Sequence, residues 1–204
     1  NIGNASEYCD MLSAFVGHLR SVFEGEKLPF LYVEIAPYNY GKGNLGASLV
    51  RQQQAKALEI IPNSGMISTI DLGDRLIHPR NKPEFGRRLA LLALTDVYGM
   101  KGLDSHAPMY KSHEVKDGAA HISLSHADNG LCPMWSQLEG FEVAGADGEW
   151  HAANASIRGA QAGLVVSSPE VPEPVNVRYN WGVVPKASVF TPMGLPLHPF
   201  TTEK

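Results

Sequence analysis

The first half of the chain alternates between two hydrophobic patterns, and this alternation constrains the fold more than any single motif. Apolar residues recur at helical spacing over 6–23, 46–60 and 82–98, whereas 29–36 and 66–71 read as short, mostly buried strands. Helices that alternate with strands in this order are typical of a parallel sheet with helices packed against it. We therefore predict an α/β fold for this half.

The strand predicted over 66–71 ends in a polar loop that contains Asp71, Asp74 and His78. In parallel α/β sheets, functional loops follow the carboxyl ends of strands. A histidine in such a loop can take a proton from a nucleophile and return it to a leaving group, and a nearby carboxylate can orient its ring. A solvated loop, with Asp74 capping a turn or paired with Arg75, is the alternative interpretation.

The helix predicted over 82–98 has clear signals at both of its ends. Asn81 suits the N-cap, Glu84 would complete a capping box, and Gly99 suits the C-terminal stop. Leucines lie on most sides of this helix, and we therefore expect it to be well covered by other parts of the protein.

After about residue 108 the pattern changes to short apolar segments separated by turn-forming residues, with a tail rich in proline, glycine and leucine. The segments are 121–125, 140–144, 163–167 and 175–179, and the tail, which we expect to be irregular, is 185–200. This spacing is typical of an antiparallel β unit. We therefore predict a boundary between residues 108 and 109.

Composition excludes several classes of function. A net charge of −4 over 204 residues disfavours binding to nucleic acid or to anionic membranes. No nucleotide-binding glycine motif is present, and His121 and His126 lack the spacing of a metal site, so we predict neither a metal nor a cofactor. Cys9 and Cys132 are the two cysteines, and their sequence positions leave a disulfide open.

Several motifs in order along the chain resemble those of the sialate O-acetylesterases, a branch of the SGNH hydrolases. The block Ile77-His-Pro-Arg-Asn-Lys82 is followed by Gly86-Arg-Arg-Leu-Ala90. Further matches span nearly the whole chain: Leu28-Pro-Phe30, Ile35-Ala-Pro-Tyr38, Pro62-Asn-Ser-Gly-Met66, Leu138-Glu-Gly-Phe-Glu-Val-Ala-Gly-Ala-Asp147, Val177-Arg-Tyr-Asn-Trp181 and Gly194-Leu-Pro-Leu-His-Pro-Phe-Thr201.

This resemblance implies an esterase that removes O-acetyl groups, notably the 9-O-acetyl group, from sialic acids or sialoglycans. It places residues 1–108 in the carboxyl-terminal part of a flavodoxin-like, three-layer catalytic domain, and 109–204 in a β-rich accessory unit. His78 matches the catalytic histidine, Asp74 the acidic residue ahead of it, and Asn1 an asparagine near the oxyanion site. An extracytoplasmic location is also implied.

The family's serine block, of the form Gly-Gln-Ser-Asn, is absent from this chain, and so is the Gln-Gly-Glu-Ser segment. We therefore expect an inactive fragment that needs the amino-terminal portion of the same protein, whether natural cleavage or truncation accounts for its first residue. Two alternatives stay open: an acetylesterase for another glycan, such as acetyl-xylan, and a carbohydrate-binding fragment without catalysis.

Overall fold

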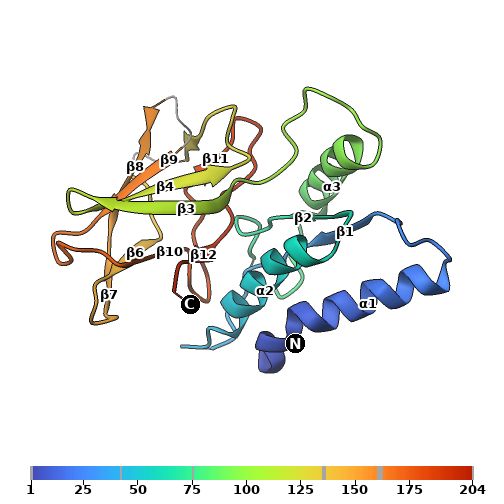
Figure 1. Ribbon diagram of the computed structural model, residues 1–204, viewed down its shortest axis with the longest axis horizontal. Helices are drawn as coiled ribbons and strands as arrows, with labels where there is room; N and C mark the ends of the chain where they lie inside the picture. The colour runs from blue at the N-terminus through green and yellow to red at the C-terminus, as the bar shows by residue number, and fades with distance from the viewer. Residues whose placement is uncertain (1, 42, 75, 135–136, 160–162, 204) are drawn as a thin grey trace. The chain divides into compact units, whose positions relative to one another are not determined.

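A computed structural model describes residues 2–41, 43–74, 76–134, 137–159 and 163–203. The chain divides into two compact units: unit 1 contains residues 1–106 and 182–184, and unit 2 contains residues 107–181 and 185–204. Unit 1 contains the helices and a parallel strand pair, whereas the described strands of unit 2 pair antiparallel (Figure 1). The chain is therefore an α/β protein, as its sequence predicts.

Unit 1 begins with a short 3-10 helix and continues with three α-helices and two strands. In chain order these are η1 (Ile2–Glu7), α1 (Tyr8–Val22), β1 (Phe30–Val33), α2 (Gly46–Ile60), β2 (Ser64–Ile67) and α3 (Lys82–Asp96). The three predicted helices and both predicted strands are present, although each strand is shorter than its hydrophobic pattern. The ladder ends at Val33 and Ile67, because the polar residues that follow, Glu34, Ser68 and Thr69, form side-chain hydrogen bonds with one another.

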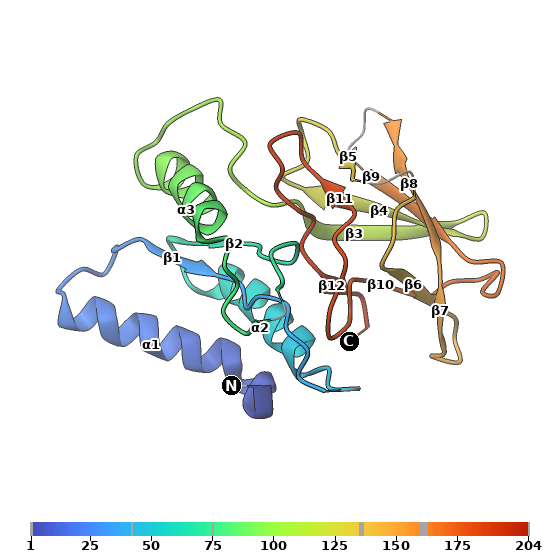
Figure 2. The same ribbon diagram turned by 180° about the vertical axis from the view of Figure 1, so that it is seen from behind.

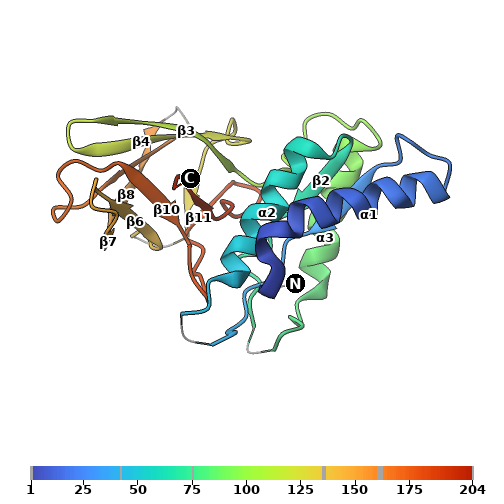
Figure 3. The ribbon, with the colours of Figure 1, turned by 60° about the horizontal axis from the view of Figure 1, so that its bottom comes forward.

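Strands β1 and β2 pair in parallel, with Phe30 opposite Ser64 and Val33 opposite Ile67. Helix α3 lies on one face of this pair, and α1 and α2 lie on the other (Figure 2). Helices α1 and α2 run side by side (Figure 3). A side chain at Gly65 would come within 3.0 Å of Leu92, so this glycine lets α3 pack closely on β2. Helices therefore cover both faces of the strand pair.

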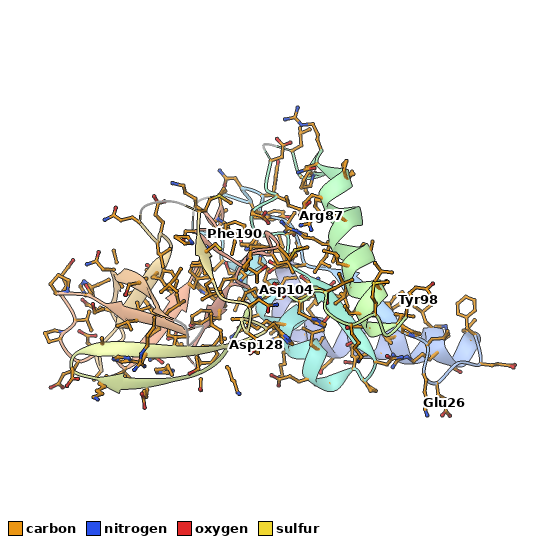
Figure 4. All side chains as sticks on the ribbon, turned by 90° about the horizontal axis from the view of Figure 1, so that it is seen from above. Glu26, Arg87, Tyr98, Asp104, Asp128 and Phe190 are labelled. Carbon is orange, nitrogen blue, oxygen red and sulfur yellow. The ribbon has the colours of Figure 1, made fainter. Side chains whose placement is uncertain are left out.

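Two predictions about α3 are wrong. Asn81 is the N-cap but makes no side-chain capping hydrogen bond, and Glu84 does not complete the capping box because its carboxylate pairs with Arg87 and Arg88. Along the helix only Arg88 and Leu92 are buried, since the sheet contacts one side of α3 alone. Tyr98, just beyond the helix, keeps 77% of its surface exposed (Figure 4).

Unit 2 contains two four-stranded antiparallel sheets and one short strand pair. The sheets have the orders β3-β4-β9-β8 and β12-β10-β6-β7, and β11 pairs with β5. The strands are β3 (Met109–Lys116), β4 (Ala119–Ser125), β5 (Cys132–Pro133), β6 (Phe141–Ala144), β7 (Trp150–Ala152), β8 (Asn154–Arg158), β9 (Gly163–Ser167), β10 (Asn176–Tyr179), β11 (Val189–Phe190) and β12 (Phe200–Thr201).

The core of unit 2 lies between these two sheets. Ile122 and Leu164 from the first sheet and Val143 and Tyr179 from the second belong to one buried cluster. Apolar side chains at alternate positions of facing sheets form the interior of a β sandwich. The tail is more ordered than predicted, because it supplies β11 and β12 and buries Leu197 completely in this cluster.

Candidate functional site

The predicted catalytic loop follows β2 in unit 1, and its first residues are tied to the end of β1. Glu34 is 1% exposed, and its Oε2 atom accepts hydrogen bonds from the Ser68 hydroxyl at 2.6 Å and the Thr69 amide at 3.0 Å. The Thr69 hydroxyl also donates to the Glu34 carbonyl at 2.9 Å. A buried carboxylate that accepts several hydrogen bonds holds its surroundings in one arrangement. The loop therefore starts from a fixed point beside β1.

Asp71, one of the two candidate orienting acids, is occupied by Arg88 from α3. The two terminal nitrogens of Arg88 donate to the two Asp71 carboxylate oxygens, each at 2.7 Å. Arg88 is 2% exposed, and it also donates to Glu84 at 2.8 Å and to the Ser68 carbonyl at 2.8 Å. This bidentate geometry gives Asp71 a structural role, because both of its oxygens are engaged in anchoring the loop to the helix.

The charges around Arg88 keep it protonated despite its burial. Burial by itself lowers the pKa of Arg88, but its hydrogen bonds and charge interactions with Asp71 and Glu84 outweigh this effect and raise the pKa. Hydrogen bonds from Arg87, and then from Arg88, lower the pKa of Glu84. The two carboxylates and the two guanidinium groups thus form one ionised cluster between α3 and the loop.

Asp74, the other candidate acid, pairs with Arg80 across the loop. Arg80 Nε donates to one Asp74 oxygen at 2.7 Å and Nη2 to the other at 3.3 Å. The Arg80 side chain is 77% exposed, whereas that of Asp74 is 19% exposed. A methyl group at the neighbouring Gly73 would lie 2.8 Å from Pro37, so this part of the loop packs against the chain that follows β1.

His78 is exposed in this loop and makes no hydrogen bond to any residue that the structure describes. The structure therefore does not join it to Asp74 or Asp71 by a hydrogen bond. The preceding Leu76 and Ile77 are 52% and 50% exposed, and Pro79 after it is buried. The imidazole is thus accessible at the surface, beside two exposed apolar side chains. Its catalytic role, like that of Asp74, stays a prediction.

The third predicted site residue, Asn1, lies outside the described residues, as does Arg75, the alternative partner of Asp74. The described chain next to Asn1 is η1, which packs against α2. Cys9 is a buried free cysteine and Cys132 an exposed one, so the disulfide left open by the sequence is not formed.

A buried polar group that the sequence did not predict joins α2 to the end of β1. Arg51 is fully buried, and its Nε donates to the Ile35 carbonyl at 3.1 Å. Its Nη1 and Nη2 atoms are buried and find no hydrogen-bond partner in the described part of the chain. Burial lowers the pKa of Arg51, and the charges of Glu34 and Tyr40 oppose this shift. Glu34 is a charged residue within the otherwise apolar stretch 29–36, and it was the one sign in the sequence that a buried partner such as Arg51 is needed there.

Gln54, one helical turn after Arg51, strengthens the same connection. Its side-chain oxygen accepts from the Ile35 amide at 2.9 Å, and its side-chain nitrogen donates to the Val33 carbonyl at 3.1 Å. Together with Arg51, this residue satisfies backbone groups of Val33, the last residue of β1, and of Ile35 just after it. Helix α2 therefore fixes the carboxyl end of β1, next to which the loop containing His78 begins.

Two features relevant to function are absent from the described residues. They contain no group of three or more histidine, cysteine, aspartate or glutamate side chains arranged to hold a metal ion. None of the helices in the ranges described is long and apolar enough to cross a membrane.

Comparison with solved structures shows a close similarity to a known protein. No family model and no curated protein sequence matches the chain. A solved structure, described as that of a novel carbohydrate acetylesterase from Xanthomonas citri, superposes with a TM-score of 0.91 at 32% sequence identity. The similarity covers 98% of this chain and 47% of that protein, so the chain spans about half the length of the protein it resembles.

Proposed function

We propose that this chain is part of a carbohydrate acetylesterase, an enzyme that cleaves acetyl esters from sugar hydroxyl groups. The observation that carries this proposal is the similarity of nearly the whole chain to the Xanthomonas citri enzyme, at 32% identity. An agreement of this kind over 98% of the chain includes the helices, the parallel strand pair and the β sandwich. The motifs that resemble sialate O-acetylesterases support the same class of reaction.

In the proposed reaction, His78 is the general base. A serine hydroxyl attacks the acetyl carbonyl, His78 accepts its proton, and the sugar oxygen leaves with that proton to give an acetyl-enzyme. Water then attacks the acetyl group, again with His78 as base, and releases acetate. The exposed position of His78 after β2 suits this role, because a substrate and a nucleophile can both reach the ring.

The nucleophile and its oxyanion donors are proposed to come from the amino-terminal portion of the same protein, with Asn1 next to the oxyanion site. This chain contains no Gly-Gln-Ser-Asn block, and it spans 47% of the enzyme that it resembles. Leu76 and Ile77 expose apolar surface beside His78, which is the kind of surface that another part of a protein covers. On this basis, the chain alone is inactive.

Asp74 is proposed to orient His78 in the complete enzyme. Of the two loop carboxylates, Asp71 has both oxygens engaged by the buried Arg88, whereas Asp74 is held by the exposed Arg80. An ion pair with an exposed arginine is weak and rearranges at little cost. Because both oxygens of Asp71 are engaged by a buried arginine, Asp71 is assigned to anchoring the loop and Asp74 to orienting His78.

The proposed substrate is a 9-O-acetylated sialic acid, and the implied location is extracytoplasmic. The alternative is another acetylated glycan such as acetyl-xylan, which the description of the Xanthomonas citri enzyme as a carbohydrate acetylesterase accommodates equally well. Both substrates undergo the same ester cleavage, so they differ only in the sugar that the site accepts.

A substrate panel tests this function. The full-length protein, including the portion before Asn1, is supplied with 9-O-acetylated sialic acid, acetyl-xylan and an acetylated non-sugar alcohol, and the release of acetate is measured. We expect the 9-O-acetylated sialic acid to be cleaved fastest. Faster cleavage of acetyl-xylan would show that the preferred substrate is acetyl-xylan and not the sialic acid. Cleavage of the non-sugar ester alone would contradict the proposal that the protein is a carbohydrate esterase.

A further inference from the structure

The outer face of the sheet β3-β4-β9-β8 in unit 2 contains a hollow of about 360 Å³. Most of the lining residues are polar, among them Ser112, Glu114, His121, Ser123 and Arg158, and Ile122 and Gly163 also line it. None of these residues takes part in the proposed ester cleavage. The volume is at the lower end of the range for small-molecule sites, about 300–1,000 Å³.

The strand register explains why this face is hollow. Ser112, Ser123, Gly163 and Arg158 follow one another across the four strands as direct partners, and directly opposed residues of antiparallel strands share a face. Ser123 and Gly163, in the middle of this row, have small side chains or none. Arg158, at one end of the row, has a much longer side chain. Ser123 and Gly163 therefore form the bottom of the hollow, and Arg158 forms one of its sides.

The next row of the sheet supplies the other charged groups. Glu114 lies directly opposite His121, and Arg158 Nη1 lies 3.4 Å from His121 Nδ1. Because arginine only donates, His121 Nδ1 accepts, and the neutral ring then has its proton on Nε2 as a further donor. Glu114 makes no hydrogen bond or ion pair with any described residue. Arg158 and His121 thus place hydrogen-bond donors side by side in the hollow, and the Glu114 carboxylate lies on the neighbouring strand next to His121.

We propose that this hollow binds a single sugar residue that bears a carboxylate, such as a hexuronate. The Arg158 guanidinium and the His121 ring would hold the sugar carboxylate, since guanidinium groups bind carboxylates through two parallel hydrogen bonds. Glu114 and the hydroxyls of Ser112 and Ser123 would bind the sugar hydroxyls. The described lining contains no phenylalanine, tyrosine or tryptophan on which a sugar ring could stack, so affinity depends on these polar contacts and favours an acidic sugar.

This binding site goes beyond the proposed esterase activity and does not depend on it. A sugar without any acetyl group should bind, and no bond is made or broken. Its test therefore uses unacetylated ligands, so that failure of the site and failure of the esterase proposal are distinguishable.

Calorimetric titration of the protein with methyl glucuronide and with methyl glucoside tests the proposal. The two ligands differ mainly in the carboxylate, and a hydrogen bond to a charged group contributes about 1.5–3 kcal/mol. We therefore expect saturable binding of the glucuronide, with an affinity at least about tenfold above that of the glucoside. Equal affinity for both, or no binding of either, would overturn the proposal.

A variant of a lining residue and a matched control variant complete the test. Arg158→Gln should weaken glucuronide binding about tenfold without affecting the glucoside, because one charged contact is lost. Lys116→Gln is the matched control: Lys116 is also exposed, lies on β3 and does not line the hollow. Equal losses in both variants would indicate a general charge effect and contradict the site, as would displacement of the glucuronide by an equal concentration of inorganic phosphate.

Discussion

Arg88 and Asp71 form a bidentate ion pair, with both N–O distances 2.7 Å, that ties helix α3 to the loop containing His78. The Arg88 side chain is 3% exposed and that of Asp71 19%, so the pair is shielded from most of the solvent. This pair fixes the loop at its start, four residues before Arg75 and seven before His78. Its loss should therefore affect both stability and the position of the histidine.

Replacing Asp71 by Asn should destabilise unit 1. Arg88 would lose its bidentate charged partner while its ion pair with Glu84 remains, and breaking a buried ion pair costs about 3–5 kcal/mol. We expect a loss near the lower end of this range, because Glu84 remains. Urea unfolding measures the change, with Asp74→Asn as the control, since Asp74 pairs with an exposed arginine. Equal stability of the two variants would contradict the anchoring role of Asp71.

Acid should weaken the same cluster through Glu84. The pKa of Glu84 is lowered in the folded protein, chiefly by its hydrogen bond with Arg87. A group with a lowered folded pKa contributes stability above its ordinary pKa, which is 4.5 here, and this contribution disappears as the pH falls through the folded pKa. The unfolding free energy should therefore fall below pH 4.5 less steeply in Glu84→Gln than in the original protein. Parallel pH profiles would contradict this prediction.

The β sandwich of unit 2 depends on a buried hydroxyl group. Tyr179 is fully buried, and its hydroxyl oxygen accepts a hydrogen bond from the Ser188 amide at 3.1 Å. In Tyr179→Phe the buried amide loses this acceptor, which should cost about 1–3 kcal/mol of unfolding free energy. Tyr98→Phe is the control, because Tyr98 is 77% exposed, and it should leave stability unchanged. A cost in the control as large as that in Tyr179→Phe would refute this account.

The two cysteines should differ strongly in reactivity. Cys132 is exposed, whereas Cys9 is buried and burial raises the pKa of its thiol. Because the thiolate is the reactive form, a thiol reagent at neutral pH should label Cys132 quickly and Cys9 only after unfolding. Mass spectrometry of the labelled protein distinguishes the two sites. Rapid labelling of Cys9 in the folded protein would show that α1 is not packed as described.

The sequence predicts the helices and strands of unit 1 because their hydrophobic periods are long and uninterrupted. It predicts less of unit 2, where β3, β7 and β8 have polar residues on an exposed face and β11 and β12 have two residues each. Local pattern does not reveal such strands, since their pairing depends on partners far along the chain. The irregular tail was misjudged for this reason.

For the candidate site too, the sequence predicts local features but not the contacts between residues far apart in the chain. Motif and strand order are sufficient to place His78 in a loop after β2. They do not reveal that Asp71 is engaged by Arg88, 17 residues further on, or that Arg51 of α2 reaches the end of β1. These contacts form only when helices pack on the strand pair. Consequently only the structure reveals that Asp71 anchors the loop, whereas Asp74 as the orienting acid stays a prediction.

The measurement that tests the central claim most directly is acetate release from 9-O-acetylated sialic acid by the full-length protein and its His78→Ala variant. Loss of the general base should lower kcat by about 10²–10⁴-fold. His18→Ala, which removes another exposed histidine, on α1, should keep full activity. Undiminished activity in His78→Ala, with the protein folded as judged by circular dichroism, would contradict the proposed function of this loop.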